Sequence, residues 1–297
     1  MHITILANRS VMPKLPTVTA FLEEQQIQVV GTETLPVAKT LAHTRCVERW
    51  QLQSDIADLD AIAWFDLGLA DNVDINFQNQ AEAISDIKLA VFDMDSTLIQ
   101  CEVIDELAIR AGVGDQVAAI TERAMRGELD FCQSFAERLD LLRGLGADTA
   151  VQIAKDLPYT DGARELMTTL RARGVKTVII SGGFSLFADH VATELGMDEY
   201  FANTLEVVDG LLTGVAIPPV VNAEYKEAKL RELADSMGIS LRQTLAVGDG
   251  ANDLKMLNAA GIGVAFRAKP LVRSQARYQL STVGLDGALY FLGNRSS

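Results

Sequence analysis

Three short apolar runs in this chain each end in a polar turn that contains glycine or aspartate. They occupy residues 89–92, 178–180 and 245–247. Short apolar runs that stop at turn residues are typical of parallel strands buried on both faces. In open α/β sheets, ligands bind at the carboxyl ends of such strands. The pattern therefore predicts an α/β fold with a three-layer, Rossmann-like parallel sheet, in which three distant segments converge on one site.

Helical periodicity fills the chain between the first two runs. Apolar residues recur at i, i+3, i+4 and i+7 over 104–111, and again at helical spacing over 131–142. We therefore predict a helical insert over approximately 101–156, which leaves the sheet beside the site and covers it as a cap. A second excursion over 205–214 has two apolar stretches joined by Asp-Gly, which predicts a β-hairpin with a type I′ turn.

The first 84 residues show a different pattern and no catalytic cluster. Four short strands and two helices are expected in the order β-α-β-β-α-β, the ferredoxin-like arrangement of a small α+β domain. With a polar linker over 78–86, the chain divides into domains 1–84 and 85–297. We interpret the first as a stability or dimerisation domain. The expected strands are 3–7, 27–30, 46–52 and 74–77, and the expected helices are 15–22 and 56–69.

Composition narrows the functional classes. No apolar run approaches the roughly 18 residues of a membrane helix, and the N-terminus lacks the basic segment of a signal peptide. The three cysteines have no metal-ligand spacing, so we expect them to be reduced and the protein to be cytoplasmic. A net charge of −14 argues against nucleic-acid and membrane partners. A small anionic substrate remains compatible, because a local cation reverses the field in a cleft.

Two pairs of carboxylates stand at predicted strand ends. Asp93 and Asp95 follow the first apolar run, and Asp249 and Asp253 follow the third. Carboxylates alone would repel a phosphate group, whereas carboxylates around Mg²⁺ would hold one. The first pair begins like a calcium-binding loop. That loop needs glycine at its sixth position and glutamate at its twelfth, and this chain has leucine and isoleucine there.

These residues follow the motif order of the haloacid dehalogenase-like phosphatases, which the chain resembles over residues 88–292. The order is Asp-x-Asp-x-Thr, a serine after a second strand, a lysine, and Gly-Asp-x-x-x-Asp. Finer details are similar to the phosphoserine phosphatase family, some bacterial members of which carry regulatory (ACT-like) extensions. The matching positions are Asp93, Asp95, Thr97, Ser181, Lys226, Gly248, Asp249 and Asp253, with the finer details at 93–99, Glu102, 127–131, Arg138 and 181–184.

The resemblance implies a covalent mechanism that suits the chemistry of these residues. Asp93 would attack phosphorus to form an aspartyl-phosphate, and Asp95 would act first as general acid and then as general base. Lys226, Ser181 and the backbone N–H of Gly182 would stabilise the phosphoryl oxygens. The predicted Mg²⁺ ligands are Asp93, Asp95 (through its carbonyl oxygen), Asp249 and Asp253. Asp253 is also expected to orient Lys226 or the metal's surroundings.

Recognition of the amino-acid part of phosphoserine is a separate prediction. Glu102 would pair with the ammonium group, and Arg138 would bind the carboxylate with two hydrogen bonds. By pattern alone, Glu102 is also typical of an acid at a helix N-terminus, and Arg138 of a surface arginine that covers apolar residues. The predicted substrate-binding residues are Glu102, Phe131, Arg138, Ser181, Gly182, Gly183, Lys226 and Asn252.

The resemblance implies an Mg²⁺-dependent hydrolase that converts O-phospho-L-serine to L-serine and phosphate, the last step of serine biosynthesis. A phosphotransferase that moves the phosphoryl group to another hydroxyl, such as that of homoserine, would use the same site. In a third, non-catalytic hypothesis, the N-terminal domain binds an amino acid and makes the protein a regulator. A homodimer through that domain is also expected.

Overall fold

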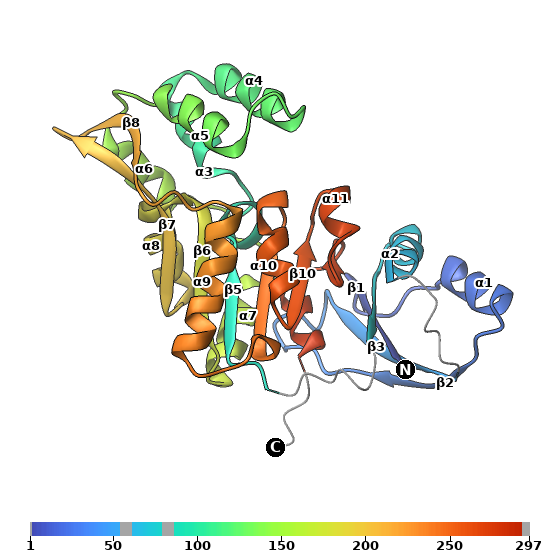
Figure 1. Cartoon of the computed structure of the whole chain (residues 1–297). Helices are drawn as coiled ribbons and strands as arrows, with labels where there is room; N and C mark the ends of the chain where they lie inside the picture. Colours follow the sequence, from blue (N-terminus) through green and yellow to red (C-terminus); the bar gives the residue numbers. More distant parts are fainter. Residues whose placement is uncertain (1, 54–60, 79–85, 293–297) are drawn as a thin grey trace.

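The computed structural model describes residues 2–53, 61–78 and 86–292, which form a small antiparallel sheet and a larger, mostly parallel one. Figure 1 shows the two units side by side, with the N-terminal unit on the right. The predicted boundary at residue 84 and the first part of the helix expected over 56–69 lie outside the described residues. The division at residue 84 therefore stays a prediction.

The small unit has the predicted order of elements. Its sheet runs β2-β3-β1-β4 with antiparallel neighbours, which is the ferredoxin-like arrangement. Alternate residues of β1, Ile3 and Ile5, pack with Val18 and Leu22 of α1 in one apolar cluster. The elements are β1 (His2–Ala7), α1 (Pro16–Glu24), β2 (Val29–Thr34), β3 (Cys46–Leu52), α2 (Ala61–Ala70) and β4 (Asp74–Gln78).

The prediction of a strand over 27–30 was wrong in its position. The strand is β2, Val29–Thr34, and it lies at the edge of the sheet. Ile27 is buried after the end of α1, where its N–H donates to the carbonyl of Leu22, whereas Val29 and Val30 are exposed. The apolar run therefore combined a residue that packs beyond a helix with two residues of an edge strand.

The large sheet has the order β11-β10-β9-β5-β6-β7-β8. All neighbours are parallel except β7 and β8, and β5 lies between β9 and β6. Alternate residues of β5 face opposite layers: Ala90 and Phe92 join the apolar cluster that includes α7 and α8, whereas Leu89 and Val91 join the one with α9 and α10. This confirms the three-layer core predicted from the apolar runs.

The elements of the core, in chain order, have the following bounds. They are β5 (Leu89–Phe92), η2 (Met94–Leu98), α7 (Ala163–Ala172), β6 (Lys176–Phe184), α8 (Ser185–Leu195), β7 (Glu199–Val208), β8 (Leu211–Ile217), α9 (Ala223–Ser236), η3 (Leu241–Gln243), β9 (Thr244–Gly248), η4 (Ala251–Asp253), α10 (Leu254–Ala259), β10 (Ile262–Phe266), α11 (Pro270–Arg273), β11 (Tyr278–Leu280) and η5 (Leu285–Phe291).

The predicted helical insert leaves the core after β5. Figure 1 shows α3, α4 and α5 standing over one end of the large sheet, with α6 lower down beside α8. We call α3 to α6 the cap. Its helices are α3 (Val103–Ala111), α4 (Gly114–Met125), α5 (Phe131–Asp140) and α6 (Ala147–Lys155).

The predicted hairpin is present, and it is attached to the cap. Asp209 and Gly210 both have positive φ angles, 51° and 79°, as a type I′ turn requires. Leu212 of β8 exchanges backbone hydrogen bonds of 2.8 Å with Gly144 and Leu145, which join α5 to α6. The hairpin therefore supports one side of the cap, a contact that the sequence did not predict.

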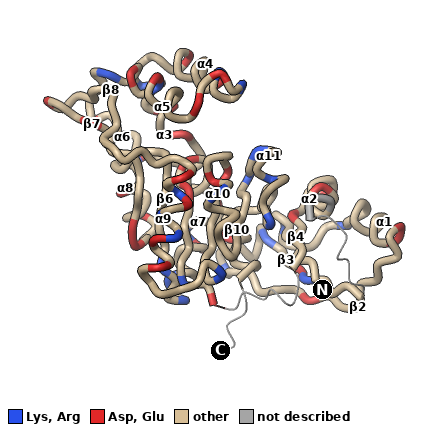
Figure 2. Tube along the Cα trace, viewed as in Figure 1, with Lys and Arg blue, Asp and Glu red and all other residues tan. Residues whose placement is uncertain are grey.

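Acidic residues are spread over the core, the cap and the small unit (Figure 2). The net charge of −14 is therefore not concentrated in one of these parts. Among the described residues, no helix is long and apolar enough to cross a membrane.

Candidate active site

The first motif forms a tight loop at the end of β5. Asp93 follows the strand, and its Oδ1 accepts a hydrogen bond of 2.8 Å from the backbone N–H of Met94. Ser96 then reverses the chain with a φ of 55°, in the left-handed region. Asp93 and Asp95 are consequently both held at the carboxyl end of the strand, and both are buried.

Lys226 reaches the same point from α9. Asn222 caps this helix by accepting a hydrogen bond from the N–H of Tyr225 at 2.9 Å. Lys226 is 0% exposed, and its Nζ lies 2.7 Å from Oδ1 of Asp253 and 2.9 Å from Oδ1 of Asp93. Burial by itself lowers the pKa of the ammonium, but the two carboxylates outweigh burial and raise it. Lys226 is therefore a permanent cation between two aspartates.

The third motif completes a group of carboxylates after β9. Oxygens of Asp93, Asp249 and Asp253 all lie within 4.8 Å of one another. Burial and the neighbouring Asp93 raise the pKa of Asp249 to about 8, and the same two causes raise that of Asp253 to about 6. Crowded carboxylates with raised pKa values suit a hard divalent cation, which prefers oxygen ligands and relieves their repulsion.

The second motif presents backbone N–H groups beside these carboxylates. The Oγ of Ser181 accepts a hydrogen bond of 2.9 Å from the N–H of Gly183. A Cβ atom on Gly183 would lie 2.9 Å from Oδ2 of Asp95 and 2.7 Å from the methyl group of Met94, so a larger residue would displace the ends of these two side chains. Asn203 of β7 donates to the carbonyl of Gly182 at 2.7 Å and fixes this peptide.

Asp95 lies buried beside other carboxylates. Burial, followed by the charges of Glu102 and Asp93, raises its pKa well above the ordinary value for aspartate. Its Oδ1 is buried without a hydrogen-bond partner among the described residues. A carboxyl group with a raised pKa is suited to donate a proton to a leaving group.

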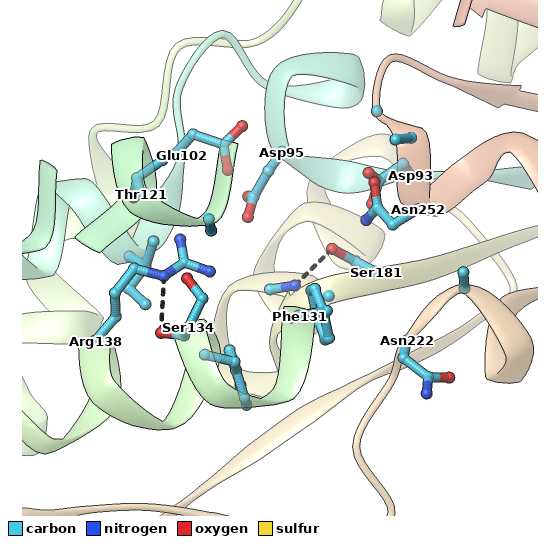
Figure 3. Close-up of a pocket in the computed structure, with 18 of the residues that line it drawn as sticks. Asp93, Asp95, Glu102, Thr121, Phe131, Ser134, Arg138, Ser181, Asn222 and Asn252 are labelled. Atoms are coloured by element: carbon cyan, nitrogen blue, oxygen red, sulfur yellow. Dashed lines mark hydrogen bonds between the residues drawn. The ribbon is translucent and has the colours of Figure 1, made fainter. Parts of the chain in front are cut away.

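Glu102 and Arg138 lie on the cap side of the site (Figure 3). The hydroxyl of Ser96 donates to Oε1 of Glu102 at 2.7 Å, and Nε of Arg138 donates to the carbonyl of Ser134 at 3.3 Å. Burial raises the pKa of Glu102 and lowers that of Arg138. In α5, the ring of Phe131 stacks on that of Phe135 one turn later, with ring centres 5.8 Å apart. The cap therefore offers one anionic group, one cationic group and an apolar wall.

A cavity of about 750 Å³ joins these groups between the cap and the core. The predicted site residues all line it except Lys226 and Asp253, which are fully buried. Lys226 contacts the lining residue Asp93, and Asp253 contacts Lys226. Figure 3 shows Asp95 between Glu102 on one side and Asp93 on the other. The structure thus brings together the residues that the sequence placed in the catalytic and amino-acid-binding groups.

The sequence analysis missed several residues of the cavity. Asp105, Met125, Asn222 and Lys269 line it, and Asn203 positions the Gly182 peptide from behind. The position of Asn222 at a helix start could have been predicted, because asparagine is a common N-cap residue. Asn203 had none, since its partners are distant along the chain.

Comparisons with known proteins agree with this geometry. Residues 87–261 match the family model of the haloacid dehalogenase-like hydrolases. The phosphoserine phosphatase of Streptococcus thermophilus is 50% identical over 199 residues, which cover 67% of this chain and 93% of that protein. The phosphoserine phosphatase SerB2 of Mycobacterium tuberculosis is 46% identical over 232 residues, or 78% of this chain and 57% of that protein. This chain therefore spans little more than half the length of SerB2.

A solved structure extends the likeness to the small unit. The unliganded crystal structure of a probable phosphoserine phosphatase from Vibrio cholerae superposes with a TM-score of 0.80 at 35% identity, and covers 98% of this chain and 86% of that one. The two-unit architecture is therefore shared with a solved protein, in addition to the core motifs.

Proposed function

Since this chain belongs to the phosphoserine phosphatases of the haloacid dehalogenase-like hydrolase family, we propose that it hydrolyses O-phospho-L-serine to L-serine and phosphate. The observation that carries the proposal is the position of Glu102 and Arg138 in one cavity with Asp93 and Asp95. The first pair suits an amino acid, and the second suits phosphoryl transfer. The relatives' name supports the same substrate.

Asp93 is proposed as the nucleophile. Its Oδ1 accepts hydrogen bonds from Met94 and Lys226, which leaves Oδ2 to attack phosphorus. The new Asp93–phosphorus bond forms as the bond from phosphorus to the serine oxygen breaks. Because the attacking carboxylate is held from one side by a cation and a backbone N–H, its orientation is set before the substrate arrives.

Asp95 is proposed to move the proton in both half-reactions. In its protonated form it donates to the departing serine oxygen, and it then takes a proton from the water that hydrolyses the aspartyl-phosphate. Its raised pKa supports the first role. The N–H of Gly182, the hydroxyl of Ser181 and Lys226 are proposed to stabilise the phosphoryl oxygens, and Asn252 to contact the same group.

The cofactor is Mg²⁺. Asp93, Asp249 and Asp253 supply carboxylate oxygens that lie close enough to share one cation, and the carbonyl of Asp95 is the fourth proposed ligand. When bound, the ion offsets the repulsion between the carboxylates and the phosphate dianion. The like-charge crowding that raises the pKa of Asp249 supports this assignment.

The substrate's amino-acid part is proposed to bind to the cap. Glu102, Phe131 and Arg138 line the cavity. In this proposal Glu102 accepts from the ammonium group, Arg138 donates to the carboxylate, and Phe131 covers the serine carbon chain. A simple aryl phosphate has neither charged group. The proposal therefore predicts selectivity for phosphoserine at the binding step.

Phosphate release from O-phospho-L-serine tests the proposal, with Mg²⁺ or with EDTA, and with phosphothreonine and p-nitrophenyl phosphate for comparison. We expect fast, metal-dependent release that prefers phosphoserine, and at least about a 10³-fold loss in Asp93→Asn, which removes the nucleophile and almost no volume. Release from p-nitrophenyl phosphate alone would contradict the substrate. The phosphotransferase alternative requires a phosphorylated product when homoserine is added, and we expect none.

For the small unit, we propose the boundaries 1–84 and 85–297 and a homodimer through the first domain. Its ferredoxin-like sheet order supports the comparison with ACT-like extensions. Light scattering on the full chain tests the dimer, and calorimetry with serine tests amino-acid binding. A monomeric mass at micromolar concentration would refute the dimer.

A further inference from the structure

The small unit is fixed to the core by buried polar contacts. The carboxylate of Asp74 in β4 accepts hydrogen bonds of 2.8 to 3.0 Å from three successive backbone N–H groups, those of residues 281–283. The amide of Asn76 makes two hydrogen bonds of 2.9 Å with the backbone of Gln279 in β11. Buried groups that are satisfied in this way specify one orientation. These contacts therefore hold the small unit in one orientation relative to the core.

Arg45 connects the small unit to two carboxylates of the core. The residue is 2% exposed. Its guanidinium donates to both oxygens of Asp286, at 2.7 and 2.9 Å, and to Oδ2 of Asp161, at 3.1 Å. Its remaining nitrogen donates to Oδ1 of Asn8 at 2.7 Å. Asp286 is buried, whereas the side chain of Asp161 is 52% exposed, so the two ion pairs differ in how much folding depends on them.

Asp161 directly follows the segment by which the chain returns from the cap. The N–H of Thr160 donates to the carbonyl of Leu98 at 2.9 Å, and the N–H of Gln100 donates to the carbonyl of Pro158 at 2.8 Å. These bonds pair the outgoing and returning hinge segments of the cap, 98–100 and 158–160. Leu98 is also the last residue of η2, the loop that carries Asp95. One short path therefore joins Arg45 to the catalytic loop.

We propose that Arg45 is a positioning residue for the active site. By holding Asp161, it lets the small unit stabilise the pairing of the two hinge segments, and with it the loop of Asp95. The inference goes beyond the proposed function and depends on it only where turnover is measured. It gives the small unit a role in catalysis that requires no bound effector.

The test separates the hinge from the rest of the interface. Replacing Arg45 would leave Asp286 buried and unpaired and could unfold the protein. Asp161→Ala in the full chain instead removes a half-exposed partner and leaves the Arg45–Asp286 pair intact. The matched control is Glu199→Ala, because the side chain of Glu199 is 39% exposed and pairs at 2.7 Å with Lys176 of β6, away from both hinge segments.

Hydrogen exchange followed by mass spectrometry measures the protection of the backbone amides in the two hinge segments, and it needs no substrate. In Asp161→Ala we expect about two- to fivefold faster exchange at Gln100 and Thr160, the range of a half-exposed ion pair. Asp161→Asn, which keeps an acceptor for Arg45, should restore part of the protection. The melting temperature and the exchange of β1 should stay unchanged. The kcat for phosphoserine should be lower in Asp161→Ala than in the wild type, in parallel with the loss of protection at the hinge.

Exchange at Gln100 and Thr160 that equals the wild type in Asp161→Ala would overturn the inference. An equal change in Glu199→Ala would also overturn it, because the effect would then be general. A wild-type protein without phosphoserine hydrolysis would refute the proposed function while leaving the exchange result to decide on the hinge.

Discussion

The ammonium of Lys226 lies 2.9 Å from Oδ1 of Asp93, and both groups are buried. Lys226 also contacts Asp253 at 2.7 Å, so one cation forms ion pairs with two of the three clustered carboxylates. Because the lysine offsets part of their repulsion before any metal or substrate binds, it contributes to folding as well as to the proposed chemistry.

Replacement of this lysine should therefore lower stability strongly. Lys226→Met leaves Asp93 and Asp253 without their cation, which we expect to cost about 3–5 kcal/mol in the metal-free protein. Chemical denaturation in EDTA measures this cost. Lys255→Met is the control, because Lys255 is half exposed and pairs with Glu224 at the surface. Adding Asp253→Asn to Lys226→Met should recover part of the loss, and no recovery would contradict this account.

The stability of the metal-free protein should fall as the pH rises from about 4 to about 8. The folded protein keeps a proton on Asp249, whose pKa is raised to about 8, whereas the unfolded chain loses it near pH 4. The folded state therefore binds more protons in this window, and raising the pH reduces the free energy of unfolding. Asp253, with a pKa raised to about 6, acts in the same direction.

Mg²⁺ competes with these protons, so its stabilising effect should grow as the pH rises. Thermal unfolding near pH 6 and near pH 8, with EDTA or with Mg²⁺, measures the difference. In Asp249→Asn the pH dependence and the Mg²⁺ effect should both shrink. A larger Mg²⁺ effect at the lower pH would be inconsistent with this carboxylate cluster.

Substrate selectivity should depend on Arg138. We expect Arg138→Ala to raise the KM for phosphoserine by about 10²-fold, the value of a bidentate, charge-assisted pair, and to change that for p-nitrophenyl phosphate much less. The second substrate has no carboxylate for this arginine to bind. Steady-state kinetics on both substrates provides the comparison, and equal losses on the two would reject the assignment.

Two neighbouring glycines should respond differently to an added methyl group. In Gly183→Ala the Cβ would lie 2.9 Å from Oδ2 of Asp95, so the buried carboxylate of Asp95 has to shift. In Gly182→Ala the nearest atom is 3.6 Å away. We expect the first variant to lose about 1–3 kcal/mol of stability and most of its kcat, and the second to keep its stability. Denaturation midpoints compare them, and similar values would refute the steric argument.

Much of the active site was predictable because its residues sit beside strong local patterns. Asp93, Ser181 and Asp249 each follow an apolar run, and parallel strands bring such positions to one edge whatever the details of packing. Arg138 and Phe131 share a helix face in the predicted cap. The hairpin turn at Asp209 was predictable for the same reason, since a type I′ turn depends on two adjacent residues.

The sequence by itself therefore determined the strand-end chemistry, the ferredoxin-like order of the small unit and the residues of the cap that face the site. Only the tertiary structure decided that Lys226 pairs with Asp93, that Asn203 fixes Gly182, and that Arg45 spans the two units. Local patterns follow from backbone geometry over a few residues. Pairings between distant segments, and the pKa values they set, depend on burial and on distances that exist only after the chain has packed.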